Sequence, residues 1–354
     1  MKGYKAYKKG LICKNKKYKE NKVFEEDEAN ICKNGIHFCV NPLDCLDYYP
    51  LVDSDGELTE FTNVENLAEE KTNDNKKYCT TRLKIGTKLG LSGFIFASIN
   101  FLLETYKIEK NIISGDYSQL VANGDGSQLA ASGNDLQLAT NEDGSQLAAS
   151  GNDSKLVASG DYSQLATSGN GSQLATSGDY SKLVASGDYS KLVASGYGSK
   201  LAASGNYSKL VADRYGSKLV AGGYNSQLAA SGDYSQLATS GNGSQLATSG
   251  DYSKLVASGY GSKLVASGYG SKLAASGNYS QLHIQGENGV GVATGQNSII
   301  KGVIGTWITL AEYDCDGKCI CVKSVRIDGK KIKANTWYKL KKGEFCIENK
   351  NNCN

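Results

Sequence analysis

Residues 177–205 read SGDYSKLVASGDYSKLVASGYGSKLAASG, in which one nine-residue unit returns with little change. Leucine occupies every ninth position from Leu120 to Leu282 without insertion or deletion, which places nineteen leucines in one register. The unit has the consensus S-G-[DNY]-[YGND]-S-[KQ]-L-[VA]-[AT], and we number its positions from the first serine. Two degenerate units, QGENGVGVA and TGQNSIIKG, follow and keep their glycines in phase. A fixed period of this kind is typical of a repeat architecture.

Each unit divides into a turn and a strand. The first four positions hold turn formers, and glycine at the second favours a backbone with positive φ. In the last five, serine, leucine and the final alanine or threonine would point to one side of a strand, and the intervening residues to the other. A helix would turn successive leucines to opposite sides, because nine residues make about two and a half turns. The pattern predicts a mostly β chain folded as a parallel β-solenoid.

Two or three units could close one coil. Leucine and alanine fill a narrow core better than a wide one. Residues 158–187 and 230–259 are identical at an offset of 72 residues, or eight units, which is a whole number of two-unit coils only. We therefore expect two units per coil, and about ten coils spaced ~4.8 Å apart would form a rod of roughly 50 Å.

The ends of a solenoid expose unpaired strand edges that need covering. Residues 1–113 combine the short strands MKGYKAY, GIHFCV and RLKIG with an apolar segment at 89–107, and we expect a small α+β domain whose helix covers the first coil. Residues 114–302 are the solenoid. Residues 303–354 are expected to form a β-meander cap with turns at Asp316-Gly317, Asp328-Gly329 and Lys342-Gly343, and with Trp307 and Trp337 in its core.

Composition narrows the functional classes. The net charge of +3 over 354 residues is too small for a nucleic-acid footprint. The apolar run at 89–103 is shorter than the ~20 residues of a membrane span, and no apolar run follows MKGYKAYKKG as in a signal peptide. We expect a cytoplasmic protein without nucleic-acid or membrane partners. The ten cysteines lie outside the repeat and match no paired C-x-x-C pattern, so we expect reduced thiols, with zinc or disulfides as alternatives, and no cofactor.

Lysine and valine pair at the sixth and eighth positions of many units and would form parallel rows. The rows form either a solvated surface, in which lysine stems cover the valines, or a regular binding face. The residues of this possible interaction face are Lys182, Val184, Lys191, Val193, Lys200, Lys209, Lys218, Lys254, Lys263 and Lys272. Tyrosines at the turns would stack as a ladder along the rod.

A second candidate site lies in the N-terminal segment GIHFCVNPLDCLDYY. It contains His37, Cys39, Tyr48 and Tyr49, and its order of strand, aromatic residue and helix loosely resembles a segment of ADP-ribosyltransferases. That resemblance implies a tyrosine that stacks on nicotinamide and a downstream glutamate, Glu57 or Glu60. The alternative is a structural histidine beside Cys39.

The run ICKNGIHFCVNPLDCLDYYP at 31–50, behind MKGYKAYKKG, resembles the N-terminal domain of an uncharacterised family encoded by phages and prophages of low-GC bacteria. In that family, short Ser-Gly-rich repeats follow and end in a segment similar to WITLAEYD and VKSVRIDGKKIKANTWYKL. The resemblance implies a phage context and no catalytic residue.

Three hypotheses follow. The first is a non-enzymatic phage protein that binds a host or phage protein and acts as a stoichiometric inhibitor of a bacterial defence component in the host cytoplasm. The second is a structural part of the virion, such as a fibre or spacer, assembled as a dimer or trimer. The third is an ADP-ribosyltransferase-like enzyme in the N-terminal domain.

Overall fold

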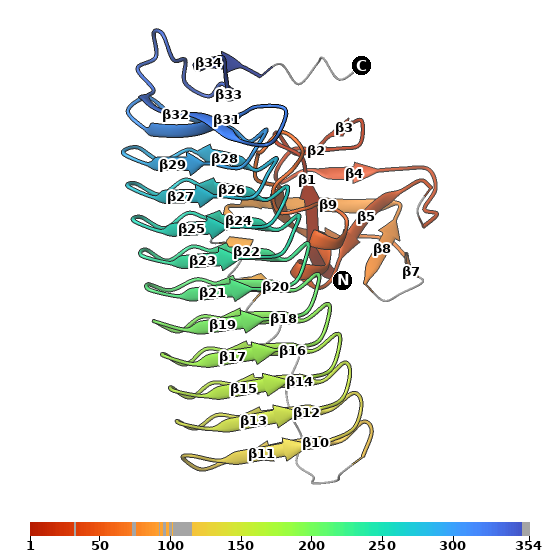
Figure 1. Ribbon diagram of the computed structural model, residues 1–354. Helices are drawn as coiled ribbons and strands as arrows, with labels where there is room; N and C mark the ends of the chain where they lie inside the picture. Colours follow the sequence, from red (N-terminus) through yellow and green to blue (C-terminus); the bar gives the residue numbers. More distant parts are fainter. Residues whose placement is uncertain are drawn as a thin grey trace. The chain divides into compact units, whose positions relative to one another are not determined.

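The structure is a computed structural model that describes residues 1–31, 33–72, 76–91, 93–94, 97–98, 101 and 115–348. The chain separates into two compact units, residues 1–105 and 106–354, and each is described by itself. Figure 1 shows the coils of the second unit stacked in chain order from β10 to β31.

The N-terminal unit contains a seven-stranded sheet in the order β4-β9-β6-β1-β5-β8-β7, and its neighbouring strands pair antiparallel. Its strands are β1 (Lys2–Tyr7), β4 (Val23–Glu25), β5 (Ile36–Cys39), β6 (Glu60–Asn66), β7 (Glu70–Thr72), β8 (Lys77–Thr80) and β9 (Arg82–Leu89). A small hairpin of β2 (Ile12–Cys13) and β3 (Lys16–Lys17) and a 3-10 helix, η1 (Pro42–Asp47), complete the unit. The three strands predicted from MKGYKAY, GIHFCV and RLKIG are confirmed as β1, β5 and β9.

The apolar segment after β9 is helical at its described positions 91, 93, 94, 97, 98 and 101. Phe94 is buried and stacks on Phe61 of β6 with ring centroids 3.9 Å apart. The Ser98 hydroxyl donates a hydrogen bond to the Phe94 carbonyl at 2.9 Å. This part of the helix is therefore anchored on the sheet of its own unit. The rest of the predicted capping helix, including residues 102–107, lies outside the described residues.

The solenoid has about 11 turns, and consecutive units alternate between two parallel sheets. Leu183 pairs with Leu201, which lies 18 residues further along the chain, so the prediction of two units per coil is confirmed. The 13-stranded sheet begins with β10 (Gln119–Ala122), β12 (Gln137–Thr140), β14 (Lys155–Ala158), β16 (Gln173–Thr176), β18 (Lys191–Ala194), β20 (Lys209–Ala212), β22 (Gln227–Ala230), β24 (Gln245–Thr248), β26 (Lys263–Ala266), β28 (Gln281–Ile284) and β30 (Ile299–Gly302). The 12-stranded sheet begins with β11 (Gln128–Ala131), β13 (Gln146–Ala149), β15 (Gln164–Thr167), β17 (Lys182–Ala185), β19 (Lys200–Ala203), β21 (Lys218–Ala221), β23 (Gln236–Thr239), β25 (Lys254–Ala257), β27 (Lys272–Ala275) and β29 (Val290–Ala293).

The core between these sheets contains the leucine row and the small residue at the ninth position, as the alternation predicts. Leu183 and Leu192 come from opposite sheets, and both are completely buried. The serine at the fifth position is also buried, and its hydroxyl caps the turn: Ser163 Oγ donates to the Gly160 carbonyl at 2.8 Å. The buried serine hydroxyl therefore has a hydrogen-bond partner within its own coil, and the apolar side chains form one thin layer between the sheets.

The turn geometry corrects the expected role of glycine. Positive φ occurs at the fourth position of the unit, as at Tyr180 (φ 54°) and Gly198 (φ 61°). Glycine at the second position has a positive φ in the first three units, at Gly115, Gly124 and Gly133, but not at later positions such as Gly196, where close stacking requires it instead. A Cβ on Gly196 would lie 1.9 Å from the carbonyl oxygen of Gly178, one coil earlier.

The C-terminal strands form two hairpins rather than the single meander expected. β31 (Trp307–Tyr313) extends the 12-stranded sheet and turns back as β32 (Cys319–Arg326), whereas β33 (Tyr338–Lys341) and β34 (Glu344–Ile347) end the 13-stranded sheet. Trp307 is 49% exposed, so the prediction that it lies in the core is wrong: it occupies an outward position of β31. Ile308, Leu310, Ile327 and Tyr338 are among the residues buried at this end.

Candidate functional site

The structure divides the predicted interaction face between two sheets, because successive units belong to opposite sides of the coil. The 12-stranded sheet carries Lys182, Val184, Lys200, Lys218, Lys254 and Lys272. The 13-stranded sheet carries Lys191, Val193, Lys209 and Lys263. The prediction of one continuous face from all ten residues is therefore wrong.

The outward side chains of the 12-stranded sheet are accessible, as at Val184, which is 49% exposed. We call the outer surface of the 12-stranded sheet from β11 to β29 the lysine face. It is an accessible surface with parallel rows of side chains, and its lysines are Lys182, Lys200, Lys218, Lys254 and Lys272.

From β17 onward, the second row of the lysine face alternates valine and alanine from one coil to the next. It runs Val184, Ala202, Val220, Ala238, Val256, Ala274 and Val292. Because neighbouring strands lie ~4.8 Å apart, valines recur about every 9.6 Å along this row. The alternation is visible in the sequence only when every second unit is read separately.

Tyrosines line the edge of the solenoid at the turns that precede the strands of the lysine face. They occupy seven successive coils, at Tyr162, Tyr180, Tyr197, Tyr215, Tyr234, Tyr252 and Tyr269. Ring centroids lie 5.5 Å apart for Tyr162 and Tyr180 and 5.3 Å apart for Tyr234 and Tyr252. The expected stacking is confirmed, but in columns on two edges, since Tyr189 and Tyr207 stack at 5.0 Å at the opposite turns.

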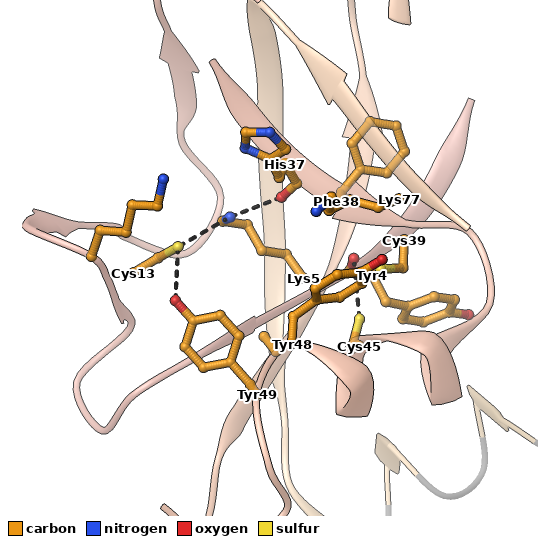
Figure 2. A pocket seen from close by; sticks show the side chains of 12 residues that line it. Tyr4, Lys5, Cys13, His37, Phe38, Cys39, Cys45, Tyr48, Tyr49 and Lys77 are labelled. Carbon is orange, nitrogen blue, oxygen red and sulfur yellow. Dashed lines mark hydrogen bonds between the residues drawn. The ribbon is translucent and has the colours of Figure 1, made fainter. Parts of the chain in front are cut away.

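The second candidate site is a cavity of about 360 Å³ in the N-terminal unit, shown in Figure 2. Strand β1, the β2–β3 hairpin, β5, η1 with the residues after it, and β8 supply its walls. We call it the N-terminal cavity, and it is lined by Tyr4, Lys5, Ala6, Cys13, Lys14, His37, Phe38, Cys39, Cys45, Tyr48, Tyr49 and Lys77. All four residues predicted in this region, His37, Cys39, Tyr48 and Tyr49, therefore lie at one site.

Hydrogen bonds hold Lys5 and Cys13 at the wall of the cavity (Figure 2). Lys5 is only 4% exposed, and its Nζ donates to the His37 carbonyl at 2.8 Å and to Cys13 Sγ at 3.5 Å. The Tyr49 hydroxyl donates to the same sulfur at 3.1 Å. Burial, followed by its bond to Cys13, raises the pKa of Tyr49, so this phenol stays protonated as a donor.

The electrostatic environment of the cavity is positive. Three lysines and no carboxylate are among its lining residues. Burial, and then the charges of Lys5, Lys77 and Lys14, lower the pKa of His37 to about 4, so the imidazole is neutral near pH 7. The hydrogen bond with Cys39, followed by burial, raises the pKa of the Cys45 thiol.

The two glutamates that the ADP-ribosyltransferase hypothesis needs do not line the cavity. Glu60 accepts hydrogen bonds from the backbone N–H groups of Gly10 and Leu11 at 2.9 and 2.8 Å. Glu57 forms an ion pair with Lys9 at 3.3 Å. Both carboxylates are thus engaged in holding the loop after β1.

Sequence reasoning missed Lys5, Cys13 and Lys77. A signal existed for Lys5, which occupies the same side of β1 as the buried Tyr7, and a lysine at an inward position is unusual. Cys13 and Lys77 come from a hairpin and a strand that only the folded sheet brings near β5.

Across the described part of the chain, the cysteines at 13, 39, 45, 79, 315, 319, 321 and 346 are all free thiols, and no group of three His, Cys, Asp or Glu side chains is arranged to hold a metal ion. No helix in that part is both long enough and apolar enough to cross a membrane.

Residues 1–97 match the family model of a domain of unknown function, DUF7666. The match covers β1 to β9 and therefore includes every strand that lines the N-terminal cavity. Comparisons with curated proteins and with solved structures found no match.

Proposed function

We propose that this chain is a non-enzymatic binding protein that presents the lysine face to the surface of another protein. The observation that carries the proposal is the regular exposure of lysine and valine rows on one sheet, with Val184, Val220 and Val256 each about half exposed. Together the rows offer charged and apolar groups at a fixed spacing, which the surface of another protein could match by complementary charges and shape.

The lysine face is held rigid by its own turns. The Asp179 carboxylate accepts a hydrogen bond from the Tyr197 N–H at 2.8 Å, and Asp161 accepts one from the Asp179 N–H at 2.7 Å. These bonds link each coil to the next, in addition to the parallel strand pairing. A preorganised surface loses little conformational entropy when it binds, which favours affinity.

The chemistry of the lysine face favours an acidic partner. In the strands of the lysine face, the outward positions hold only lysine, glutamine, valine and alanine. The aspartates of the neighbouring turns accept backbone hydrogen bonds at the edge, as Asp179 does. The complementary surface would place carboxylates opposite the lysines and small apolar groups opposite the valines.

The phage context suggested by the sequence resemblance makes a host protein the natural partner, and stoichiometric inhibition of a defence component is the specific role we propose. A binding face without catalytic groups acts by occupying its target, so inhibition would saturate at a fixed ratio of the two proteins.

The test is affinity capture from a host lysate with three forms of the full chain, quantified by mass spectrometry. The face variant, Lys200→Glu with Lys218→Glu, reverses two adjacent charges. The matched control, Lys330→Glu with Lys331→Glu, makes the same charge change on exposed residues outside the lysine face. A partner retained by the wild type and the control but lost by the face variant supports the proposal, and equal capture by all three forms contradicts it.

The exposed valine row also favours a second candidate, self-association as a fibre or spacer. A dimer or trimer that buries Val184, Val220 and Val256 would hide about half of each side chain from water. Light scattering at micromolar concentration separates the two functions, because a monomer contradicts the fibre and a dimer or trimer broken by Val220→Glu supports it.

A further inference from the structure

We propose that the N-terminal cavity binds a small organic anion that carries a planar ring, of about the size of a nucleoside monophosphate. This site is separate from the lysine face and independent of its proposed role. The inference rests on an uncompensated buried cation, on the charge of the cavity wall, and on the aromatic groups that surround it.

The buried cation is Lys5. Its side chain is almost inaccessible, and among the described residues it forms no ion pair with a carboxylate. Its ammonium group is stabilised by the His37 carbonyl, by Cys13 and by the ring faces of Tyr7 and Tyr18, whose centroids lie 5.5 and 5.2 Å away. A buried charge that is balanced only by dipoles and π faces is costly, and a bound anion would compensate it.

Two further lysines make the cavity selective for anions. Lys14 and Lys77 lie on the lining with Lys5, and none of the twelve lining residues is acidic. A concave site with low-dielectric walls concentrates the field of such charges and draws in ligands of opposite sign. The depressed pKa of His37, to which all three lysines contribute, is consistent with this field.

The remaining walls favour a planar group. Phe38, Tyr48 and Tyr49 line the same cavity, and Lys77 Nζ lies 4.3 Å from the centroid of the Tyr48 ring. A cation beside an aromatic surface suits a ligand in which an anionic group adjoins a ring. The volume of about 360 Å³ is within the range of sites for small organic ligands.

Isothermal titration of the full chain with AMP, UMP, indole-3-carboxylate, inorganic phosphate and adenosine tests the proposal. AMP and UMP represent phosphates, indole-3-carboxylate represents carboxylates, phosphate lacks the ring, and adenosine lacks the charge. We expect at least one of the three ring-bearing anions to bind with one-to-one stoichiometry and a dissociation constant below about 1 mM. Binding at least tenfold weaker is expected for phosphate and adenosine, because each supplies only half of the contacts.

Variants at the cavity decide where that ligand binds. Lys14→Ala and Lys77→Ala should each weaken binding about tenfold, as expected for the loss of a charged hydrogen bond. Lys9→Ala is the control, since Lys9 is an exposed lysine of the same unit that pairs with Glu57 outside the cavity. Lys5→Met removes the buried cation and should also weaken binding. Circular dichroism checks that this variant folds. If the variant is unfolded, the Lys14→Ala and Lys77→Ala variants decide the outcome.

Alkylation of Cys13 gives an independent readout. Iodoacetamide reacts as the thiolate displaces iodide, with formation of the S–C bond and release of the thiol proton to the buffer. The bound ligand should slow the alkylation of Cys13 at least several-fold and leave that of Cys315, which is exposed on the other unit, unchanged. The proposal is overturned if none of the three ring-bearing anions binds, or if binding is unaffected by both lining variants and Cys13 stays unprotected.

Discussion

Gly196 stacks directly over Gly178, and a Cβ added to Gly196 would lie 1.9 Å from the Gly178 carbonyl oxygen. The contact is with backbone, so no side-chain movement relieves it. The same relationship recurs along the solenoid, as between Gly250 and Gly232 at 2.1 Å. The spacing of the coils therefore requires a residue without a side chain at this turn.

We expect Gly196→Ala to lower the free energy of unfolding of the solenoid by about 2 kcal/mol, in the range of other overpacked sites. The control is Gly222→Ala, because a Cβ on Gly222 meets nothing closer than 3.9 Å and its φ is not positive. That substitution should be neutral or slightly stabilising. Urea unfolding of the two variants measures the difference, and equal midpoints would contradict the packing argument.

Tyr180 adopts a left-handed conformation with φ of 54°, and its ring stacks on Tyr162. Tyr180→Val should destabilise the solenoid by about 1–2 kcal/mol, because a β-branched residue is disfavoured at positive φ and the stacking is lost. Tyr180→Asn loses the same ring but tolerates this backbone, as Asn225 does at φ 53°. The comparison of the two unfolding curves isolates the backbone contribution, and Val and Asn variants of equal stability would refute it.

Much of the solenoid could be predicted because its information is periodic. The leucine at the seventh position and the duplication of eight units determine both the strand and the two-unit coil. The predictions that were wrong concern features that depend on how the coils stack and how consecutive units are divided between the sheets. The role of glycine at the second position follows from a carbonyl one coil away, and Val184 and Val193 lie on opposite sides of the coil because consecutive units belong to different sheets.

The N-terminal cavity was only partly predictable for a related reason. One short segment of the sequence contains His37, Cys39, Tyr48 and Tyr49, so they could be predicted to lie at the same site. Lys5 and Lys77 join them through the pairing of β5 with β1 on one side and β8 on the other. A sequence without a period carries no comparable signal for which strands become neighbours.

Asp213 interrupts the repeat at a position that is usually serine. One carboxylate oxygen, Oδ1, is buried without a hydrogen bond, and the nearest cation, Arg214 Nε, is 3.9 Å away. Burial raises the pKa of Asp213 to about 6 from 3.8. The folded state therefore holds a proton between these pH values that the unfolded chain has released, and the contribution of Asp213 to stability falls as the pH rises from 4 to 6.

We expect Asp213→Ser, which restores the consensus, to raise the stability of the solenoid at pH 7.5 by about 1 kcal/mol, since an unsatisfied buried acceptor is removed. The gain should shrink at pH 4.5, where Asp213 is protonated in the folded state. Unfolding midpoints of the two proteins at both pH values measure this, and a gain that is equal at both would contradict burial of the charge as its cause.

His37 should give the opposite pH dependence in the N-terminal unit. Its folded pKa of about 4 lies below the ordinary histidine value of 6.5, so the unfolded chain binds the proton first as the pH falls. The stability of this unit should therefore decrease as the pH is lowered from about 6.5 to 4, and His37→Gln should reduce that decrease. Hydrogen exchange followed by peptide-resolved mass spectrometry separates the two units, with His283→Gln in the solenoid as the control.

If the proposed anion binds near His37, a saturating ligand should raise the His37 pKa measured by NMR, because the ligand's negative charge opposes the field of Lys5, Lys14 and Lys77. A His37 pKa near 6.5 in the unliganded protein would show that the lysines and burial do not act on the imidazole as the structure indicates.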